Sequence, residues 1–209
     1  GYRIDNYLGD QGYHLEIWCE KSTMNDVLIP LCERYQINLV TGVGEMSITA
    51  VLQLAERFQE DRPVRIFYVS DFDPAGQSMP VAVARKIEYF QRDKGYSADV
   101  RLYPVVLTID QVRSYRLPRT PIKDSERRAA HFENRYGAGA VELDALEALY
   151  PGQLAEILTR EIGRYYDARL TARVTQARQR LERVLNDERQ AVIAAHAAEL
   201  DELVAEYAA

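Results

Sequence analysis

The chain lacks the features that mark several large classes of protein. It has two cysteines, Cys19 and Cys32, and three histidines in 209 residues, with none at the spacing of a zinc site. This scarcity excludes a disulfide scaffold and favours a reducing compartment. No apolar run approaches the ~20 residues that a membrane span requires, and no signal peptide opens the chain. We therefore expect a soluble, cytoplasmic protein with no membrane contact.

Basic residues are also in deficit, which at first argues against a nucleic-acid-binding protein. There are 26 Lys and Arg against 32 Asp and Glu, and the formal charge is −6. The deficit is local, however. Residues 1–80 contain 6 basic and 12 acidic side chains, whereas residues 101–135 contain 8 basic and 4 acidic ones. Because local clusters set the electrostatic field more than the sum does, the composition leaves DNA binding open.

The apolar periodicity predicts strands and helices in alternation. Strands are expected at residues 13–19, 38–41, 64–70 and 99–107, and helices at 22–35, 47–58 and 78–91. Ser22 is the expected N-cap of the first helix, and Pro80 is expected in the first turn of the third. The order predicts an α/β fold with a mostly parallel sheet flanked by helices, of the Rossmann-like kind.

The last part of the chain has a different character. After a polar stretch with short helices at 108–139 and a helix from about Pro151, the 46 residues that follow Gly163 contain no Gly or Pro. Apolar residues at helix-face intervals predict one long helix or a helical hairpin, through which the chain forms a homodimer or binds a partner protein. The predicted divisions are a lead-in at 1–12, an α/β domain at 13–163 and a helical extension at 164–209.

The main chemical feature is a pair of carboxylates at the end of an apolar strand. Asp71 and Asp73 follow residues 64–70 directly and precede a Pro-Ala-Gly turn, and Glu20 follows the first strand. Ligands of open α/β sheets bind at the carboxyl ends of the strands, so we expect the three acids to meet at one edge. Mg²⁺ prefers such oxygen ligands, and the sequence therefore predicts a metal site.

Each of these residues also has a simpler interpretation. Asp71 and Asp73 would then only end a strand and cap a helix, and Glu20 would only pair with Lys21 on the surface. The Gly42-Val43-Gly44 segment would be an ordinary turn. Glu142 and Asp144 either extend the metal site or belong to a turn.

Together, a Glu after the first strand, a Gly-containing turn after the second and D-x-D-P-x-G after the third resemble a Toprim domain. The pattern is most similar to the Toprim part of the topoisomerase VI A subunit and meiotic double-strand-break protein family, including its bacterial and mobile-element relatives. Residues 105–118, 123–125 and 141–146 resemble later parts of that family as well. The resemblance extends over residues 13–167.

The resemblance implies a role for each matching residue. Glu20 corresponds to a general acid or base, and Asp71 and Asp73 correspond to metal ligands. Gly76 corresponds to the glycine that lets the next helix approach the sheet. The breakage-and-joining enzymes of the family use a tyrosine on a preceding winged-helix domain, whereas only about a dozen residues precede the first strand here. The chain is then a fragment of a larger protein, or water is the nucleophile.

These observations together predict Mg²⁺-dependent cleavage or transfer of DNA phosphodiester bonds, with Mn²⁺ as a substitute metal. The enzyme would be a nuclease or would break strands as a topoisomerase does. Basic side chains downstream and beside Glu20 are expected to hold the DNA backbone. They are Lys21, Arg113, Arg116, Arg119, Lys123, Arg127 and Arg128.

Two other functions remain open on the sequence. One is a DNA-binding or assembly module without catalysis, in which the acidic edge holds a structural metal. The other is a haloacid-dehalogenase-like phosphatase, which also places D-x-D after a strand. That class usually has Thr or Val two positions after the second Asp, where this chain has Ala75.

Overall fold

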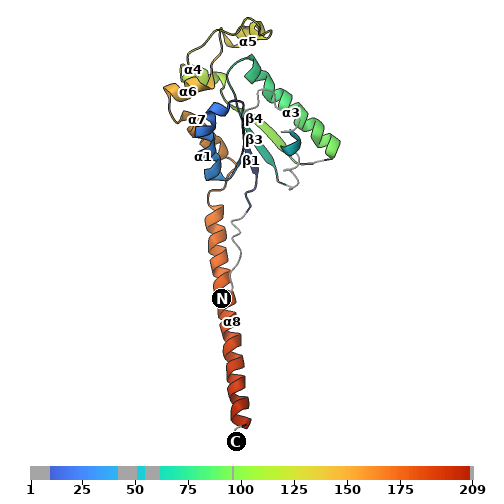
Figure 1. The fold of residues 1–209 in the computed structure, drawn as a ribbon, viewed down its shortest axis with the longest axis vertical. Helices are drawn as coiled ribbons and strands as arrows, with labels where there is room; N and C mark the ends of the chain where they lie inside the picture. Colours follow the sequence, from blue (N-terminus) through green and yellow to red (C-terminus); the bar gives the residue numbers. More distant parts are fainter. Residues whose placement is uncertain (1–9, 42–50, 55–61, 96, 208–209) are drawn as a thin grey trace. The chain divides into compact units, whose positions relative to one another are not determined.

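A computed structural model gives the fold, and it describes residues 10–41, 51–54, 62–95 and 97–207. The larger of its two compact units is Gly12–Tyr166, and residues 167–207 belong to the other. The larger unit is built on a four-stranded sheet with the order β2-β1-β3-β4, in which every neighbouring pair is parallel (Figure 1). Its strands are β1 (His14–Cys19), β2 (Asn38–Thr41), β3 (Val64–Val69) and β4 (Val100–Val106). The predicted α/β fold with a parallel sheet is confirmed.

Helices cover both faces of this sheet. Figure 1 shows α1 (Asn25–Tyr35) and α7 (Gln153–Ile162) on one side and α3 (Pro74–Lys94) on the other. Alternate residues of each strand point to opposite faces, which produces two apolar clusters. The cluster under α1 and α7 includes Leu15, Ile17, Phe67, Leu28 and Leu154. The cluster under α3 includes Trp18, Ile66, Tyr68, Val83 and Ile87.

The sheet also buries two charged side chains, both of which are bonded. Glu16 accepts hydrogen bonds from Trp18 Nε1 at 2.6 Å and bonds His14 Nε2 at 2.8 Å. Arg65 donates from Nη2 to Asp99 Oδ2 at 2.8 Å and from Nη1 to the Asp99 carbonyl at 2.9 Å. A buried charge is costly unless it is paired, and these contacts explain how Arg65 is tolerated in the otherwise apolar β3.

Beyond β4 the chain forms the expected short helices. They are α4 (Ile109–Ser114) and α5 (Ala129–Tyr136). A further helix, α6 (Leu143–Leu149), was not predicted: the sequence indicated a strand or turn at residues 141–144. Just before α6, Val141 exchanges two backbone hydrogen bonds of 2.9 Å with Phe72 in an isolated antiparallel bridge. This bridge holds the 141–144 stretch against the turn that carries Asp71 and Asp73.

The predicted helix boundaries need two corrections. Ser22 does not cap α1: it opens a 3-10 helix, η1 (Ser22–Met24), and α1 starts at Asn25. The third helix starts at Pro74 rather than at residue 78, because Asp73 Oδ1 accepts the Gly76 N–H at 2.6 Å and caps it. Pro80 consequently lies in the interior of α3 and is buried, not in its first turn.

Only part of the second predicted helix can be compared with the structure. Residues 51–54 are helical. The rest of the predicted 47–58 helix, and the predicted turn residues Gly42 and Gly44, lie outside the described residues.

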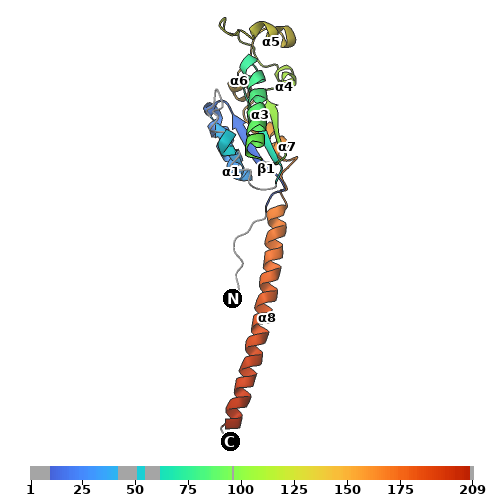
Figure 2. The same ribbon diagram turned by 90° about the vertical axis from the view of Figure 1, so that its right-hand side faces the viewer.

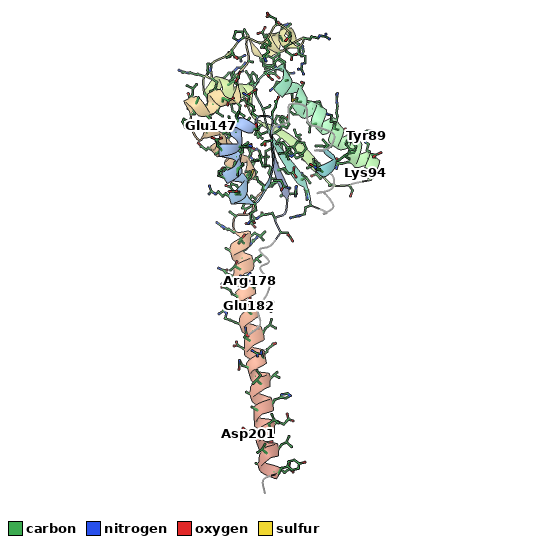
Figure 3. All side chains as sticks on the ribbon, viewed as in Figure 1. Tyr89, Lys94, Glu147, Arg178, Glu182 and Asp201 are labelled. Carbon is green, nitrogen blue, oxygen red and sulfur yellow. The ribbon has the colours of Figure 1, made fainter. Side chains whose placement is uncertain are left out.

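The C-terminal segment forms one helix, α8 (Leu170–Tyr207), without the break that a hairpin needs (Figure 2). None of its described side chains is buried, and Arg178, Glu182 and Asp201 project from successive parts of it (Figure 3). No helix in the described ranges combines the length and apolar character that a membrane crossing requires.

Gly76 determines how closely α3 approaches the end of β3. A Cβ atom at this position would lie 2.1 Å from the backbone oxygen of Asp71 and 2.9 Å from Ser70 Oγ. The first of these atoms belongs to the backbone, so it cannot rotate away. This close approach agrees with the role predicted for Gly76 in helix packing.

We expect Gly76→Ala to destabilise the protein by about 2–3 kcal/mol, because the added methyl group must displace the Asp71 backbone. Urea denaturation measures the change. Gly12→Ala is the matched control, since nothing lies within 4 Å of a Cβ there. Equal stability of the two variants would contradict the close approach.

Candidate active site

The pairing of β1 with β3 brings the three predicted carboxylates together. Cys19 lies opposite Val69 in the register, and the Glu20 N–H donates to the Val69 carbonyl at 3.2 Å. Glu20 therefore leaves the sheet at the same edge as Asp71 and Asp73. Their proximity has an electrostatic effect: burial first, and then the charges of Asp73 and Asp71, raise the pKa of Glu20 to about 7.

Asp71 and Asp73 each have one carboxylate oxygen fixed by a backbone amide. Asp71 Oδ1 accepts the Leu143 N–H at 2.7 Å, and Asp73 Oδ1 accepts the Gly76 N–H at 2.6 Å. In the described part of the chain, neither Oδ2 atom makes a hydrogen bond or an ion pair. Burial raises the pKa of Asp71 even though the Leu143 hydrogen bond and the Lys21 charge oppose it. The two aspartates are thus oriented, and each keeps an oxygen for a ligand.

Lys21, which the sequence predicts to contact DNA, lies among these acids. Its Nζ atom is 2.6 Å from Asp144 Oδ2, 3.2 Å from Glu142 Oε2 and 3.3 Å from Asp71 Oδ1. The hydrogen bond from Lys21 lowers the pKa of Asp144. Burial opposes the charge of Lys21, but the Asp144 hydrogen bond and the Asp71 charge outweigh it and raise its pKa. Lys21 thus links the end of β1 to the start of α6.

A cavity of about 350 Å³ opens over this edge of the sheet. Its lining includes Lys21, Asp71, Asp73, Lys123, Glu126 and Glu142. Lys123 is exposed and is the predicted DNA-contacting residue that reaches the cavity from the segment between α4 and α5. The acidic edge therefore has one cation inside its cluster and a second on the cavity wall.

Arg119 has an internal role. Its guanidinium donates to the carbonyl oxygens of Tyr136, Gly137, Ala138 and Gly139 at 2.9–3.2 Å. It also lies 5.7 Å from the centre of the Phe72 ring. Arg119 therefore holds the turn after α5, and a contact with DNA would compete with these bonds.

The remaining predicted basic residues are exposed. Arg113 lies in α4, and Arg116 follows α4 with a positive φ of 50°. Arg127 and Arg128 precede α5. Arg128 is held by two contacts of 2.8 Å to the Glu126 carboxylate and donates to Ser78 Oγ at 2.5 Å. None of these four side chains lines the cavity that contains Asp71 and Asp73.

The donor set fits Mg²⁺ through two carboxylates rather than three. Among the described residues, no three His, Cys, Asp or Glu side chains are arranged so that they would hold a metal ion by themselves. Mg²⁺ sites commonly use one or two carboxylates and complete the shell with waters and substrate phosphate oxygens. The open oxygens of Asp71 and Asp73 suit that arrangement.

No family model matches the chain, and no curated protein matches it.

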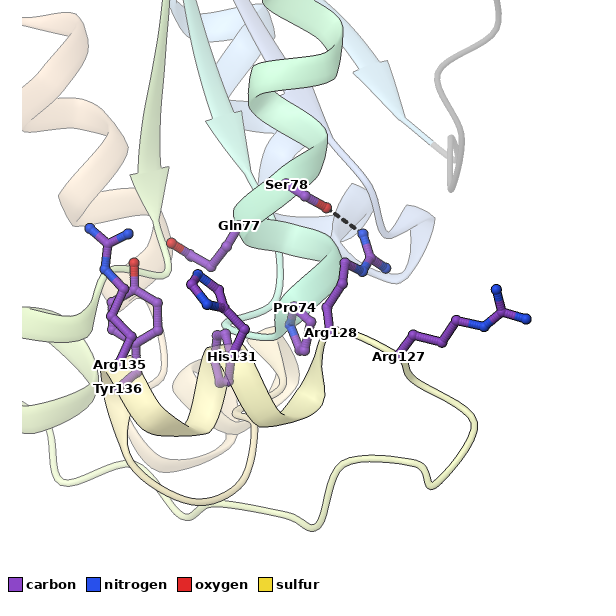
Figure 4. A pocket seen from close by; sticks show the side chains of 9 residues that line it. Pro74, Gln77, Ser78, Arg127, Arg128, His131, Arg135 and Tyr136 are labelled. Carbon is purple, nitrogen blue, oxygen red and sulfur yellow. Dashed lines mark hydrogen bonds between the residues drawn. The ribbon is translucent and has the colours of Figure 1, made fainter.

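Sequence reasoning missed a second cavity, which lies between α3 and α5 (Figure 4). Arg128, His131 and Arg135 all line it. Their spacing of three and four residues puts them on one face of a helix, and that spacing is the signal that was available in the sequence.

The raised pKa of Glu20 predicts a pH-dependent cost to stability in the absence of metal. A carboxyl whose pKa rises from 4.5 to about 7 on folding destabilises the folded state most above pH 7, where it is charged in both states. Below pH 4.5 it is protonated in both states, and this destabilisation disappears. Since Glu20 is only half-buried, we expect Glu20→Gln to stabilise the protein by about 1 kcal/mol at pH 8 relative to pH 5.

Urea denaturation in EDTA at the two pH values measures this difference. Glu33→Gln, which removes an exposed carboxyl of α1, is the control and should show no such pH dependence. If the free energy of unfolding of Glu20→Gln, relative to wild type, changes between pH 5 and pH 8 no more than that of Glu33→Gln, the carboxylates do not interact as described.

Proposed function

We propose that this chain is a Toprim-like catalytic domain of an enzyme that cleaves or transfers DNA phosphodiester bonds with the help of Mg²⁺. The observation that carries the proposal is the meeting of Glu20, Asp71 and Asp73 at the ends of adjacent parallel strands. The amide-fixed orientation of both aspartates supports it, because a catalytic metal site needs ligands that are held in place before the substrate binds.

In the proposed site, Asp71 and Asp73 would hold Mg²⁺ where a phosphate of the DNA backbone could reach it. The bound metal supplies positive charge that stabilises the phosphoryl-transfer transition state. Glu20 would move a proton at the 3′ oxygen. Lys123, which lines the same cavity, would pair with a neighbouring phosphate.

The nucleophile distinguishes two versions of the reaction. A tyrosine oxygen from an upstream winged-helix domain would attack the phosphorus, break the P–O bond and leave a phosphotyrosine link with a free DNA hydroxyl. Water would break the same bond and leave a phosphate monoester end and a free hydroxyl. The residues of the site serve both versions equally.

One observation favours the alternative of a module without catalysis. The Lys21 ammonium lies 3.3 Å from Asp71 and already neutralises part of the acidic edge without a metal. In such a module the edge would organise the fold, and DNA or protein binding would take place on the basic surfaces. Its DNA affinity would fall with salt but would not depend on Mg²⁺.

A plasmid-nicking assay with Mg²⁺ or Mn²⁺ tests the proposed function. We expect Asp71→Asn, Asp73→Asn and Glu20→Gln each to reduce the nicking rate by about 100-fold or more, since each removes a charge at the reacting phosphate. Asp110→Asn, an exposed acid in α4, is the control and should nick at the wild-type rate.

Calorimetric titration with Mg²⁺ provides a second readout that does not depend on a complete nucleophile. The wild-type protein and Asp110→Asn should bind Mg²⁺ in the presence of a short DNA, whereas Asp71→Asn and Asp73→Asn should not. The assignment would be refuted if all three variants nick plasmid at the wild-type rate, or if Asp71→Asn and Asp73→Asn bind Mg²⁺ as the wild-type protein does.

A further inference from the structure

The cavity between α3 and α5 adjoins the candidate active site. Its volume is about 400 Å³, and Pro74 lines both this cavity and the one that contains Asp71 and Asp73. Sites for small ligands commonly measure ~300–1,000 Å³, so the space suits a single nucleotide and is too small for a duplex. A nucleotide bound here would lie beside the phosphate held at the carboxylates.

One wall of the cavity is apolar. Pro74 and Phe132 are buried, and Phe132 packs against Phe72 and Tyr136 with ring centroids 5.1–5.2 Å apart. Phe72 also packs against Tyr136 at 5.2 Å, so the three rings form a closed cluster. Such a wall suits the flat, apolar face of a nucleobase.

The same cavity is also lined by polar and cationic groups. In Figure 4 His131 points toward Gln77, and both side chains carry hydrogen-bond donors and acceptors that suit the edge of a base. The Arg135 guanidinium lies 5.2 Å from the centre of the Tyr136 ring, which keeps it at the cavity. Arg128 is already held by Glu126 and Ser78, and Arg127 extends away from the other lining side chains (Figure 4).

We propose that this cavity binds one unstacked nucleotide of the DNA, so that the substrate of the enzyme contains unpaired nucleotides next to the bond that is cut. In this arrangement the base lies against the Phe132 wall, its edge meets Gln77 and His131, and Arg135 pairs with its phosphate. A base in a duplex must first leave its stack to enter such a cavity, so single-stranded DNA binds best. The inference rests on the proposed function for its choice of DNA as the ligand.

Fluorescence anisotropy in EDTA tests the inference without the metal site. The probes are a short labelled single strand of mixed sequence, the matching blunt duplex and an all-abasic strand of equal length. We expect the single strand to bind at least about tenfold more tightly than either of the others. Arg135→Ala and His131→Ala should each weaken single-strand binding by about tenfold.

Lys94→Ala is the matched control for Arg135→Ala. It removes one exposed cation at the C-terminal end of α3, whereas the cavity lies at the N-terminal end of that helix (Figure 3). Both substitutions change the net charge by the same amount. Its effect should be less than about threefold. Equal weakening by Lys94→Ala and Arg135→Ala, or equal binding of abasic and normal strands, would overturn the proposal.

A free deoxynucleoside monophosphate distinguishes a DNA strand from a small nucleotide effector. It should compete only weakly, because it lacks the neighbouring phosphates, and competition as strong as that of the strand would overturn the choice of DNA. Asp71→Asn separates this proposal from the catalytic one. We expect it to keep the single-strand preference in EDTA, whether or not the wild-type protein nicks plasmid.

Discussion

The parallel pairing of β1 with β3 is the constraint on which the rest of the candidate site depends. A single register, with Cys19 opposite Val69, places Glu20 at the edge where Asp71 and Asp73 emerge. A shift of one residue would turn Glu20 to the other face of the sheet. Because side chains on both faces of these strands are buried, such a shift would also exchange residues between the two apolar clusters and disrupt their packing, and the core thus protects the geometry of the acids.

Residues far along the chain complete what the two strands begin. The Leu143 N–H fixes Asp71, Lys21 reaches Glu142 and Asp144, and the Phe72–Val141 bridge holds that stretch in place. Three acids in a half-buried edge repel one another, and Lys21 offsets part of this repulsion. These contacts fix the acids without a ligand, which would lower the entropic cost of binding one.

The sequence predicts the parts of this site that depend on local rules. Apolar strands, the Asp71-x-Asp73 pair and Gly76 were identified because strand periodicity, strand-end acids and a turn glycine leave short-range patterns. The ion pairs of Lys21 with Glu142 and Asp144 join residues more than a hundred positions apart, and no local pattern encodes them. For the same reason Arg119 was predicted to contact DNA, although its donors are engaged by four carbonyl groups.

The turn from β3 into α3, which contains Asp73 and Gly76, has a consequence for recognising other proteins that share this turn. Asp73 caps α3 by accepting the amide hydrogen of the residue three positions later, and at that residue the neighbouring backbone leaves no room for a Cβ atom. The two requirements fall on the same position, so the interval between aspartate and glycine is fixed by steric exclusion and by hydrogen-bond geometry at once. Divergent sequences that build this turn should keep the interval long after the residues around it have changed.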